Sequence, residues 1–404
     1  MGRVHRSNES FEEPRTQWTP DSVTFPAGDL MGLMNKRIVI DAAMVRRGGG
    51  FTHLVNALPE ILSNAPETRF LLLARGQTVT QALPEAPNLD LEVLPDAGPI
   101  QRLRFQVEQA GGLSRRFGAD LYYSVAETAA WGLPCPLVVS FRNPNVFTSL
   151  DQGWGLYQSF RLPALRRAAI RTAHRAARVI FVSHASARWI GDSIGLDPSK
   201  RSVVHHGIDP RPWMPIDRDA NRRSGILSVS TVYRYKNFVR LIEAWRSIAE
   251  NRVKPPELTL IGDVVDRQHA QAMQIARKHC GALAESIHIL GAVPYADIPS
   301  QYQRSAVFAF PSYLETFGHP LLEAMASDLP VVAAETEVFK EVAGNAAVYC
   351  DPFDIGSIAS ALAQTLDQSE LRQRLTEAGR RRIAEFTWTH TAQKTLQIFS
   401  EILK

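Results

Sequence analysis

The sequence predicts an α/β protein with two doubly wound domains, each a parallel sheet covered by helices on both faces. Short, continuous apolar runs alternate with helical segments along the chain, which is typical of strands that are buried on both sides. One proline-rich segment near the middle, residues 207–224, interrupts this alternation and separates two similar series. The length of 404 residues leaves room for two or three domains.

The first series begins with a strand, a glycine loop and a helical pattern. A strand over residues 37–41 is followed by Gly48, Gly49 and Gly50, and the helical pattern begins at Phe51. Four more apolar runs follow before the break, at residues 70–74, 121–123, 136–140 and 179–182. We therefore expect a mobile tail over residues 1–33 and a first domain over residues 34–210.

The second series predicts another domain over residues 211–385. Its five expected strands cover residues 225–229, 258–261, 287–290, 307–310 and 330–333. A segment with helical periodicity, residues 386–404, ends the series. Two such domains place a ligand in the cleft between them, because the carboxyl ends of the strands in both sheets face that cleft.

Composition excludes several classes of protein. Lys and Arg number 45 against 41 Asp and Glu, and a net charge of +4 gives no reason to expect nucleic-acid binding. Cys135, Cys280 and Cys350 lie far apart, which argues against a disulfide framework or a structural zinc site. No apolar run is long enough for a membrane span, and the N-terminal residues lack the apolar core of a signal peptide. We therefore expect a cytoplasmic protein.

The most informative motif covers residues 311–325, where a predicted strand passes through a turn into a helix. Glu315 and Glu323 are seven residues apart, with Gly318 in the turn and Pro320 at a position that suits the first turn of a helix. A helix N-terminus offers free amides and a positive dipole end, and both favour phosphate. The two glutamates are suited to hydrogen bonds with ligand hydroxyls, Glu323 with a ribose diol.

This motif resembles the Glu-x7-Glu motif of retaining glycosyltransferases of the GT-B fold, particularly family 4, with Phe317 and Gly318 in its middle. The resemblance continues in the same order over nearly the whole chain. The other matching segments are the glycine loop at residues 48–50, residues 179–183 with 203–209, the donor phosphate loop at 228–237, and residues 258–263, 330–333 and 386–388. It implies two Rossmann-like domains and a C-terminal helix, residues 386–404, that returns to the first domain.

The resemblance also implies which residues bind and transfer the donor sugar. Lys236 is the expected cation at the donor diphosphate, and Glu315 is the second expected catalytic residue. The donor-binding residues it implies are Gly49, Gly50, Thr231, Arg234, Phe317, Gly318, His319, Pro320, Leu321 and Glu323. Thr231 replaces an arginine that is frequent in the family five positions before the lysine, and Arg234 is a candidate substitute.

The first domain departs from the family at a second position. Many relatives carry a histidine after the strand that corresponds to residues 137–141, and Arg142 and Asn143 stand there in this chain. Both are expected on the acceptor side, although Arg142 suits a loop salt bridge equally well. His184 and His206 also lie near strand ends, where a structural role is the favoured interpretation.

The expected chemistry is retention of anomeric configuration without a metal. The resemblance implies attack on the face that the leaving group departs from, with a departing phosphate oxygen as the base toward the acceptor hydroxyl. No cofactor is expected beyond the nucleotide-diphosphate sugar, because Lys236 and the helix N-terminus supply positive charge. The acidic pairs Asp263 with Asp266 and Asp351 with Asp354 do not have Asp-x-Asp spacing.

The positive charge is concentrated in one segment. Residues 142–188 hold eight arginines and a single acid, Asp151. Within residues 160–178 we expect Arg167, Arg171, Arg175 and Arg178 on one face of an amphipathic helix, a pattern that suits an anionic membrane surface. The alternative is a solvated helix face. The protein is accordingly expected in the cytoplasm, with peripheral attachment to the inner face of the plasma membrane as one interpretation.

The function that these patterns favour is transfer of a hexose, with GDP-mannose as the first choice of donor. The acceptor is expected to be a glycan or a lipid-linked sugar in surface polysaccharide, lipopolysaccharide or glycolipid assembly. Two alternatives stay open: a sugar-nucleotide 2-epimerase, and a noncatalytic partner that binds nucleotide sugars.

Overall fold

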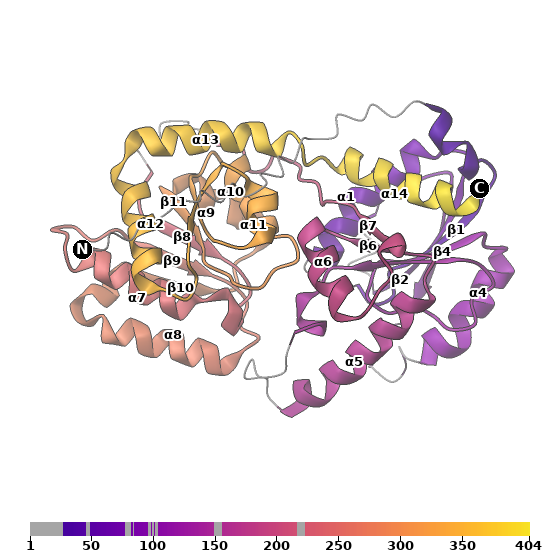
Figure 1. The fold of residues 1–404 in the computed structure, drawn as a ribbon, viewed down its shortest axis with the longest axis horizontal. Helices are drawn as coiled ribbons and strands as arrows, with labels where there is room; N and C mark the ends of the chain where they lie inside the picture. The colour runs from indigo at the N-terminus through magenta and orange to yellow at the C-terminus, as the bar shows by residue number, and fades with distance from the viewer. Residues whose placement is uncertain are drawn as a thin grey trace, which may run out of the picture.

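The protein folds into two α/β domains that lie side by side, as a computed structural model shows (Figure 1). The structure describes residues 27–45, 49–76, 82–83, 85–95, 98, 101, 104–148, 156–215 and 223–404. The tail predicted over residues 1–33 falls largely outside these ranges. Its last part differs from the prediction, because Ala27–Leu33 forms a 3₁₀ helix (η1) and Leu33 is buried.

The first domain is built on a parallel sheet of seven strands in the order β3-β2-β1-β4-β5-β6-β7. The strands are β1 (Arg37–Asp41), β2 (Arg69–Arg75), β3 (Leu89–Leu94), β4 (Leu121–Ser124), β5 (Leu137–Phe141), β6 (Arg178–Phe181) and β7 (Arg201–Val203). The helical segments are η1, α1 (Gly49–Asn64), a π-helical turn η2 (Phe105–Gln109), α4 (Ala110–Phe117), η3 (Pro144–Val146), α5 (Leu156–Arg175), α6 (His184–Ser193) and η4 (Pro198–Lys200).

The second domain repeats this plan with six parallel strands in the order β10-β9-β8-β11-β12-β13. The strands are β8 (Ile226–Val229), β9 (Leu258–Ile261), β10 (Ile287–Gly291), β11 (Val307–Phe310), β12 (Val331–Ala334) and β13 (Ala347–Cys350). The helical segments are η6 (Arg234–Lys236), α7 (Phe238–Ala249), α8 (Arg267–His279), η7 (Gly281–Ser286), η8 (Tyr295–Asp297), α9 (Ile298–Arg304), α10 (His319–Ala326), α11 (Glu337–Ala343), α12 (Ile355–Asp367) and α13 (Ser369–Ile383).

All ten predicted strands are present, and the three that the apolar runs missed are edge strands. These are β3 at one end of the first sheet, β7 at its other end and β13 at the end of the second. An edge strand has a neighbour on one side only, so part of its surface stays in water. β3 alternates apolar and acidic residues and is half exposed, which is why no continuous apolar run marks it.

Within the described part of the chain, two segments cross between the domains, and these two crossings touch each other. The amide of Ile208 donates to the carbonyl of Phe386 at 3.0 Å. A Cβ on Gly207 would lie 2.2 Å from the amide nitrogen of Trp388, so only glycine permits this approach. The last helix, α14 (Trp388–Leu403), then packs on the first domain, with Leu396 in the same core cluster as Leu54 of α1. The predicted return of this helix is thereby confirmed (Figure 1).

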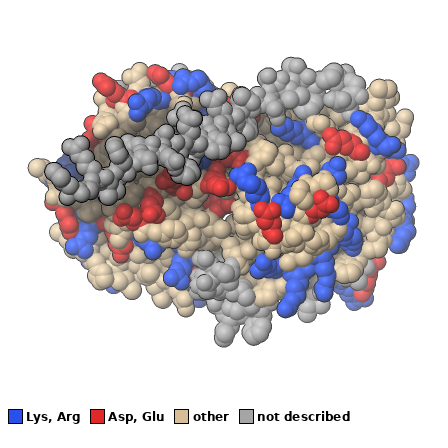
Figure 2. Space-filling view, in the orientation of Figure 1, with Lys and Arg blue, Asp and Glu red and all other residues tan. Residues whose placement is uncertain are grey.

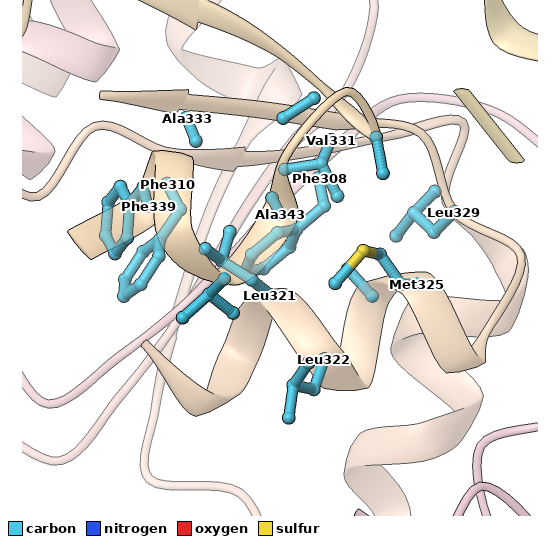
Figure 3. Packing of buried hydrophobic residues seen from close by; sticks show 14 of the residues in the cluster. Phe308, Phe310, Leu321, Leu322, Met325, Leu329, Val331, Ala333, Phe339 and Ala343 are labelled. Carbon is cyan, nitrogen blue, oxygen red and sulfur yellow. The ribbon is translucent and has the colours of Figure 1, made fainter. Parts of the chain in front are cut away.

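The core of the second domain holds α10 firmly against the sheet. Leu321 and Met325 of α10 pack among aromatic side chains of β11 and α11 (Figure 3). Phe310 stacks on Phe339 with ring centroids 5.1 Å apart. Because this packing fixes the helix, it also fixes the turn that precedes it.

The three cysteines are unpaired, and the described helices are unsuited to cross a membrane. All three cysteines are free, and burial raises the pKa of the Cys350 thiol to about 12, so it stays protonated. Within the described ranges, no helix has both the length and the apolar composition that a membrane crossing needs.

The close approach of β9 to the loop after β8 gives a stability prediction. A Cβ on Gly262 would lie 1.7 Å from the carbonyl oxygen of Ser230, so Gly262→Ala forces the backbone apart. We expect a loss of about 3 kcal/mol or more, and a fall in Tm of about 6 °C or more by thermal denaturation. Gly112→Ala in α4 is the control, since its nearest neighbour lies at 3.7 Å and the helix gains from alanine. Equal Tm values for the two variants would refute the close approach.

Candidate functional site

A cavity of about 510 Å³ lies between the two domains, at the carboxyl ends of both sheets. Its first-domain walls come from the loops after β1, β4, β5, β6 and β7 and from the start of α1. Its second-domain walls come from the loops after β8 and β11. The residues that line it include Gly50, Glu127, Arg142, Asn143, Asn145, His206, Thr231, Tyr235, Lys236, Glu315, Thr316, Phe317, Gly318, His319 and Pro320.

An ion pair stands at the second-domain wall. Lys236 Nζ, at the end of η6, donates to Glu315 Oε1 in the turn after β11. The two side chains are 12% and 11% exposed, so each charge is largely removed from water and held by the other. Lys236 Nζ also lies 5.3 Å from the ring centroids of Tyr235 and Phe310, where aromatic faces attract a cation. The sequence therefore predicted two residues that the fold brings into direct contact.

Backbone contacts fix the loops that carry this pair. Asn237 adopts a left-handed conformation with φ of 67°, and its side-chain amide donates to the carbonyls of Pro311 at 3.1 Å and Pro352 at 2.5 Å. The hydroxyl of Ser312 donates to the carbonyl of Tyr235 at 3.2 Å. The lysine loop and the acidic loop are thus bound to each other, and their charged side chains need little reorganisation before a ligand arrives.

The turn before α10 presents backbone amides to the cavity. Gly318 has φ of 90°, and a Cβ there would lie 2.7 Å from a ring carbon of Phe339. Pro320 has no amide hydrogen, and the amide of Leu321 donates to the carbonyl of Gly318 at 2.9 Å. That leaves the amides of Gly318 and His319 at the positive end of the helix dipole, an arrangement suited to phosphate oxygens.

The second glutamate of the motif lies behind this turn. Glu323 Oε2 accepts from the hydroxyl of Tyr302 at 2.9 Å, and Oε1 lies 3.4 Å from His319 Nδ1. His319 Nε2 donates to the carbonyl of Gly207 at 3.1 Å, so this ring links α10 to the crossing between the domains. Glu323 does not line the cavity, and Leu321 is wholly buried in the core.

Arg142 supplies a buried cation from the first domain. Its Nε donates to Ser140 Oγ at 3.1 Å and its Nη2 to Tyr123 Oη at 3.0 Å. Its Nη1 is buried and has no hydrogen-bond partner. Its side-chain contacts are therefore with hydroxyls and not with a carboxylate, and burial lowers the pKa of the guanidinium. An unpaired buried donor on a cavity wall is costly unless a ligand accepts from it.

Glu127 holds this arginine loop in position. One carboxylate oxygen, Oε1, accepts from the amides of Arg142 at 3.1 Å and Asn143 at 2.8 Å. Asn143 Oδ1 in turn accepts from the amide of Asn145 and begins η3. Sequence reasoning missed Glu127 and Asn145, because nothing local marks a loop residue that a neighbouring strand end brings to the same edge.

His206 lines the cavity, although the sequence favoured a structural role for it. The residue is 6% exposed, and its Nε2 has no hydrogen-bond partner. Its ring lies 5.2 Å from that of His53 in α1. Burial, and then the charge of Arg142, lowers the pKa of both imidazoles well below 6.5, so both are neutral at pH 7.

Two hydrogen bonds join the domains directly beside the cavity. Thr316 Oγ1 donates to the carbonyl of Arg142 at 2.6 Å. Ser183 Oγ donates to the carbonyl of Thr316 at 2.7 Å. The acidic loop of the second domain is therefore seated on the first domain, and Lys236 and Arg142 lie on the walls of one cavity.

Most of the predicted site residues line this cavity, and four do not. Gly50, Arg142, Asn143, Thr231, Lys236, Glu315, Phe317, Gly318, His319 and Pro320 line it. The side chain of Arg234 is exposed and lies outside the lining, as do Glu323 and Leu321. Gly49 begins α1 next to the lining residue Gly50. The ligand-binding roles of all these residues stay predictions.

One further pair of acidic residues bears on the question of a metal requirement. The run from Asp217 through Arg218 to Asp219 does have Asp-x-Asp spacing, and it lies outside the described residues. The absence of a metal requirement therefore stays a prediction for experiment.

The basic helix differs from the sequence prediction in two ways. α5 ends at Arg175, and Arg178 begins β6, so the four arginines do not share one helix face. Arg175 Nη2 donates to the carbonyl of Ala130 at 2.5 Å, and its guanidinium lies 5.5 Å from the ring of Trp131. The apolar face of α5 packs into the core of the first domain. Arg167 and Arg171 stay exposed, where Figure 2 shows basic side chains gathered over α5.

Two family models match the chain, one for each domain. The model "Glycosyltransferase Family 4" matches residues 48–211, and the model "Glycosyl transferases group 1" matches residues 216–382. Together they account for most of the chain. The chain belongs to the family 4, group 1 glycosyltransferases, as the Glu-x7-Glu resemblance predicted.

Two characterised relatives are mannosyltransferases by name. The chain is 34% identical to the O-antigen chain mannosyltransferase B of Escherichia coli over 113 residues. This match covers 28% of this chain and 30% of that protein. Over 239 residues it is 26% identical to the MMP α-(1→4)-mannosyltransferase of Mycolicibacterium hassiacum, 58% of this chain and 56% of that protein. The chain thus spans less than two thirds of the length of either relative.

A solved structure extends the likeness to the whole fold. Anabaena Alr3699/HepE, in complex with UDP and glucose, superposes with a TM-score of 0.71 at 18% identity. The match covers 91% of this chain and 100% of that chain. The GT-B architecture is thereby confirmed: two Rossmann-like domains that face a cleft.

The buried imidazoles predict how stability depends on pH. His53 and His206 are neutral in the folded protein, whereas the unfolded chain protonates them below about pH 6.5. The unfolded state then binds more protons, so acidification destabilises the fold, by up to about 1.4 kcal/mol per pH unit for each histidine. We expect Tm to fall between pH 7.5 and 5.5, and to fall less in His206→Gln. His279→Gln, which changes an exposed histidine of α8, is the control. Identical pH dependence in all three proteins would contradict the prediction.

Proposed function

We propose that this chain is a retaining glycosyltransferase that moves a hexose from a nucleotide-diphosphate sugar to a glycan or lipid-linked acceptor. The observation that carries the proposal is the Lys236–Glu315 pair on the wall of the interdomain cavity, beside the amides that precede α10. Family membership supports the reaction class. The expected setting is surface polysaccharide, lipopolysaccharide or glycolipid assembly.

The leaving diphosphate explains why the site needs fixed positive charge. Negative charge grows on the diphosphate as the glycosidic bond breaks, and preorganised donors stabilise that charge more than they stabilise the ground state. In our proposal Lys236 and the amides of Gly318 and His319 contact the diphosphate. Glu315 accepts hydrogen bonds from hydroxyls of the transferred sugar and keeps the ammonium in place.

The first domain would then hold the acceptor. Arg142 offers one unpaired N–H group, and neutral His206 offers one unpaired ring nitrogen. We propose that the two groups bind acceptor or sugar hydroxyls when the domains are together.

We propose same-face attack in place of a covalent glycosyl-enzyme. Besides Glu315, the cavity is lined by one other carboxylate, that of Glu127, among the residues the structure describes. Its Oε1 is engaged by two backbone amides, which suits a role in positioning the Arg142 loop. The departing phosphate oxygen is then the base for the acceptor hydroxyl. No metal is required in this scheme, because the lysine and the helix N-terminus neutralise the diphosphate.

GDP-mannose is the donor we propose first. Its support is that the two relatives described above carry mannosyltransferase in their names. A thermal-shift screen with UDP, GDP, ADP and their sugars identifies the base and sugar, because a ligand of the folded state raises Tm by mass action.

Variants of the ion pair test the proposed activity. We expect Lys236→Ala and Glu315→Gln each to lower kcat/KM by about 100-fold or more, the effect of removing one preorganised electrostatic contact. The assay follows hydrolysis and transfer from GDP-mannose, with EDTA present and with the anomeric configuration of the product read by NMR. Lys340→Ala, which removes an exposed lysine of α11, keeps wild-type rates and is the matched control.

Each contrary outcome has a definite meaning. An inverted product contradicts same-face attack, and loss of activity in EDTA with recovery in magnesium contradicts the metal-independent scheme. Nucleotide-sugar binding without hydrolysis or transfer supports a noncatalytic partner, and a 2-epimerised sugar supports the epimerase.

We also propose that the exposed basic side chains over residues 160–178 contact an anionic membrane surface. The contact is electrostatic, since the apolar face of α5 is used in the core. Peripheral attachment at the inner face of the plasma membrane would bring the cavity near lipid-linked acceptors.

Charge reversal on α5 tests this attachment. Each basic residue near an anionic surface contributes about 1 kcal/mol, so Arg167→Glu with Arg171→Glu should weaken binding to anionic vesicles by about 30-fold or more. Binding is measured by vesicle sedimentation at low salt, against vesicles of neutral lipid. The matched control reverses two exposed arginines of α13, Arg374 and Arg381. Wild-type protein that stays in the supernatant with anionic vesicles would refute the attachment.

A further inference from the structure

Three metal-ligating side chains meet at the boundary between the domains, outside the cavity. His184 begins α6, His205 follows β7, and Glu341 lies in α11. Their ligand atoms all lie within 4.8 Å of one another. None of the three lines the interdomain cavity, so the site proposed for sugar transfer does not account for them.

The cluster is rigidly supported from both sides. Glu341 Oε1 accepts from the amide of His184 at 2.7 Å, and Oε2 accepts from the amide of Ala185 at 2.9 Å. The carboxylate of the second domain therefore caps the first turn of a first-domain helix. His205 Nε2 donates to Glu341 Oε1 at 2.7 Å, and the rings of His184 and His205 lie edge to face, 5.7 Å apart. Figure 1 shows α6 and α11 facing each other across this boundary.

Two imidazoles and one carboxylate form a borderline ligand set. Such a set suits Zn²⁺, Co²⁺ or Ni²⁺, whereas Mg²⁺ and Ca²⁺ prefer oxygen ligands. We propose that His184, His205 and Glu341 bind a zinc-class ion that clamps the two domains together. The ion belongs to this boundary site and takes no part in the transfer reaction.

The burial of the three residues suits a reversible site. The side chains of His205 and Glu341 are 14% and 10% exposed, which limits competition from water. His184 is exposed, so an ion has a path from solvent.

Protons compete with the ion for this site. His205 Nε2 carries a hydrogen toward Glu341 in the structure, and an ion takes the place of that hydrogen. Arg188 is paired with Glu337 at 2.9 Å, which moderates its repulsion of a cation. Binding should therefore strengthen from pH 6 to pH 7.5.

An ion at this site would hold the two domains together, because its ligands come from both of them. His184 and Glu341 belong to different domains, and opening of the cleft separates them. An ion that needs both residues binds the closed arrangement more tightly and shifts the population toward it. The structural consequence is reduced opening of the α6–α11 boundary.

Metal binding is tested directly on the untagged chain without substrate. ZnCl₂ is titrated calorimetrically at pH 7.5 and pH 6, and CoCl₂ is followed by its visible absorption, which is intense for a tetrahedral site. We expect one ion per chain, with affinity lowered at least tenfold in His184→Ala and in Glu341→Gln. His279→Ala removes an exposed histidine far along the chain and keeps wild-type affinity. Equal affinity in wild type and His184→Ala, or no binding in either, overturns the site.

Hydrogen exchange tests the clamp. We expect ZnCl₂ to slow amide exchange in peptides that cover α6 and α11 in the wild type, and to leave it unchanged in His184→Ala. Binding without any change of exchange in these helices overturns the clamp. Both measurements are independent of the proposed transferase activity, so failure of one proposal does not affect the other.

Discussion

The contact between Gly207 and Trp388 is the constraint on which the rest of the structure depends. Among the described residues the chain passes between the domains at these two places, and a Cβ on Gly207 would lie 2.2 Å from the Trp388 amide. That approach positions His206 on the cavity wall and lets His319 of α10 reach the carbonyl of Gly207. It also directs α14 onto the first domain. One close backbone contact thus sets how the two halves of the site face each other.

Around this crossing, charge is removed from water on both sides of the cleft. The second domain compensates its own charges, because Lys236 and Glu315 hold each other. The first domain leaves one guanidinium nitrogen of Arg142 and one imidazole nitrogen of His206 unpaired. Buried polar groups without partners are costly in a folded protein. Both groups lie on the wall of the interdomain cavity, where they are available to a ligand.

The limits of prediction follow from the kind of signal each element carries. β1 and β11 are buried on both faces, so their apolar runs could be found in the sequence, whereas β3 and β7 at the sheet edge gave no such run. α5 shows a second limit. Its arginine spacing predicted one basic face, but the chain turns into β6 before Arg178, and Arg175 contacts the carbonyl of Ala130. Helical spacing says nothing about where a helix ends or which side chains the core engages.

The sequence by itself determined the two-domain parallel architecture and the motif residues Lys236, Glu315, Gly318 and Pro320, because periodicity, turn chemistry and Glu-x7-Glu spacing are local properties. Only the tertiary structure decided that Lys236 and Glu315 form an ion pair, and that Glu127 holds the Arg142 loop. It also decided that Glu341 of one domain meets His184 of the other, 157 residues away in the chain. Such contacts join residues from different strand ends and domains, and their geometry depends on packing that no local pattern encodes.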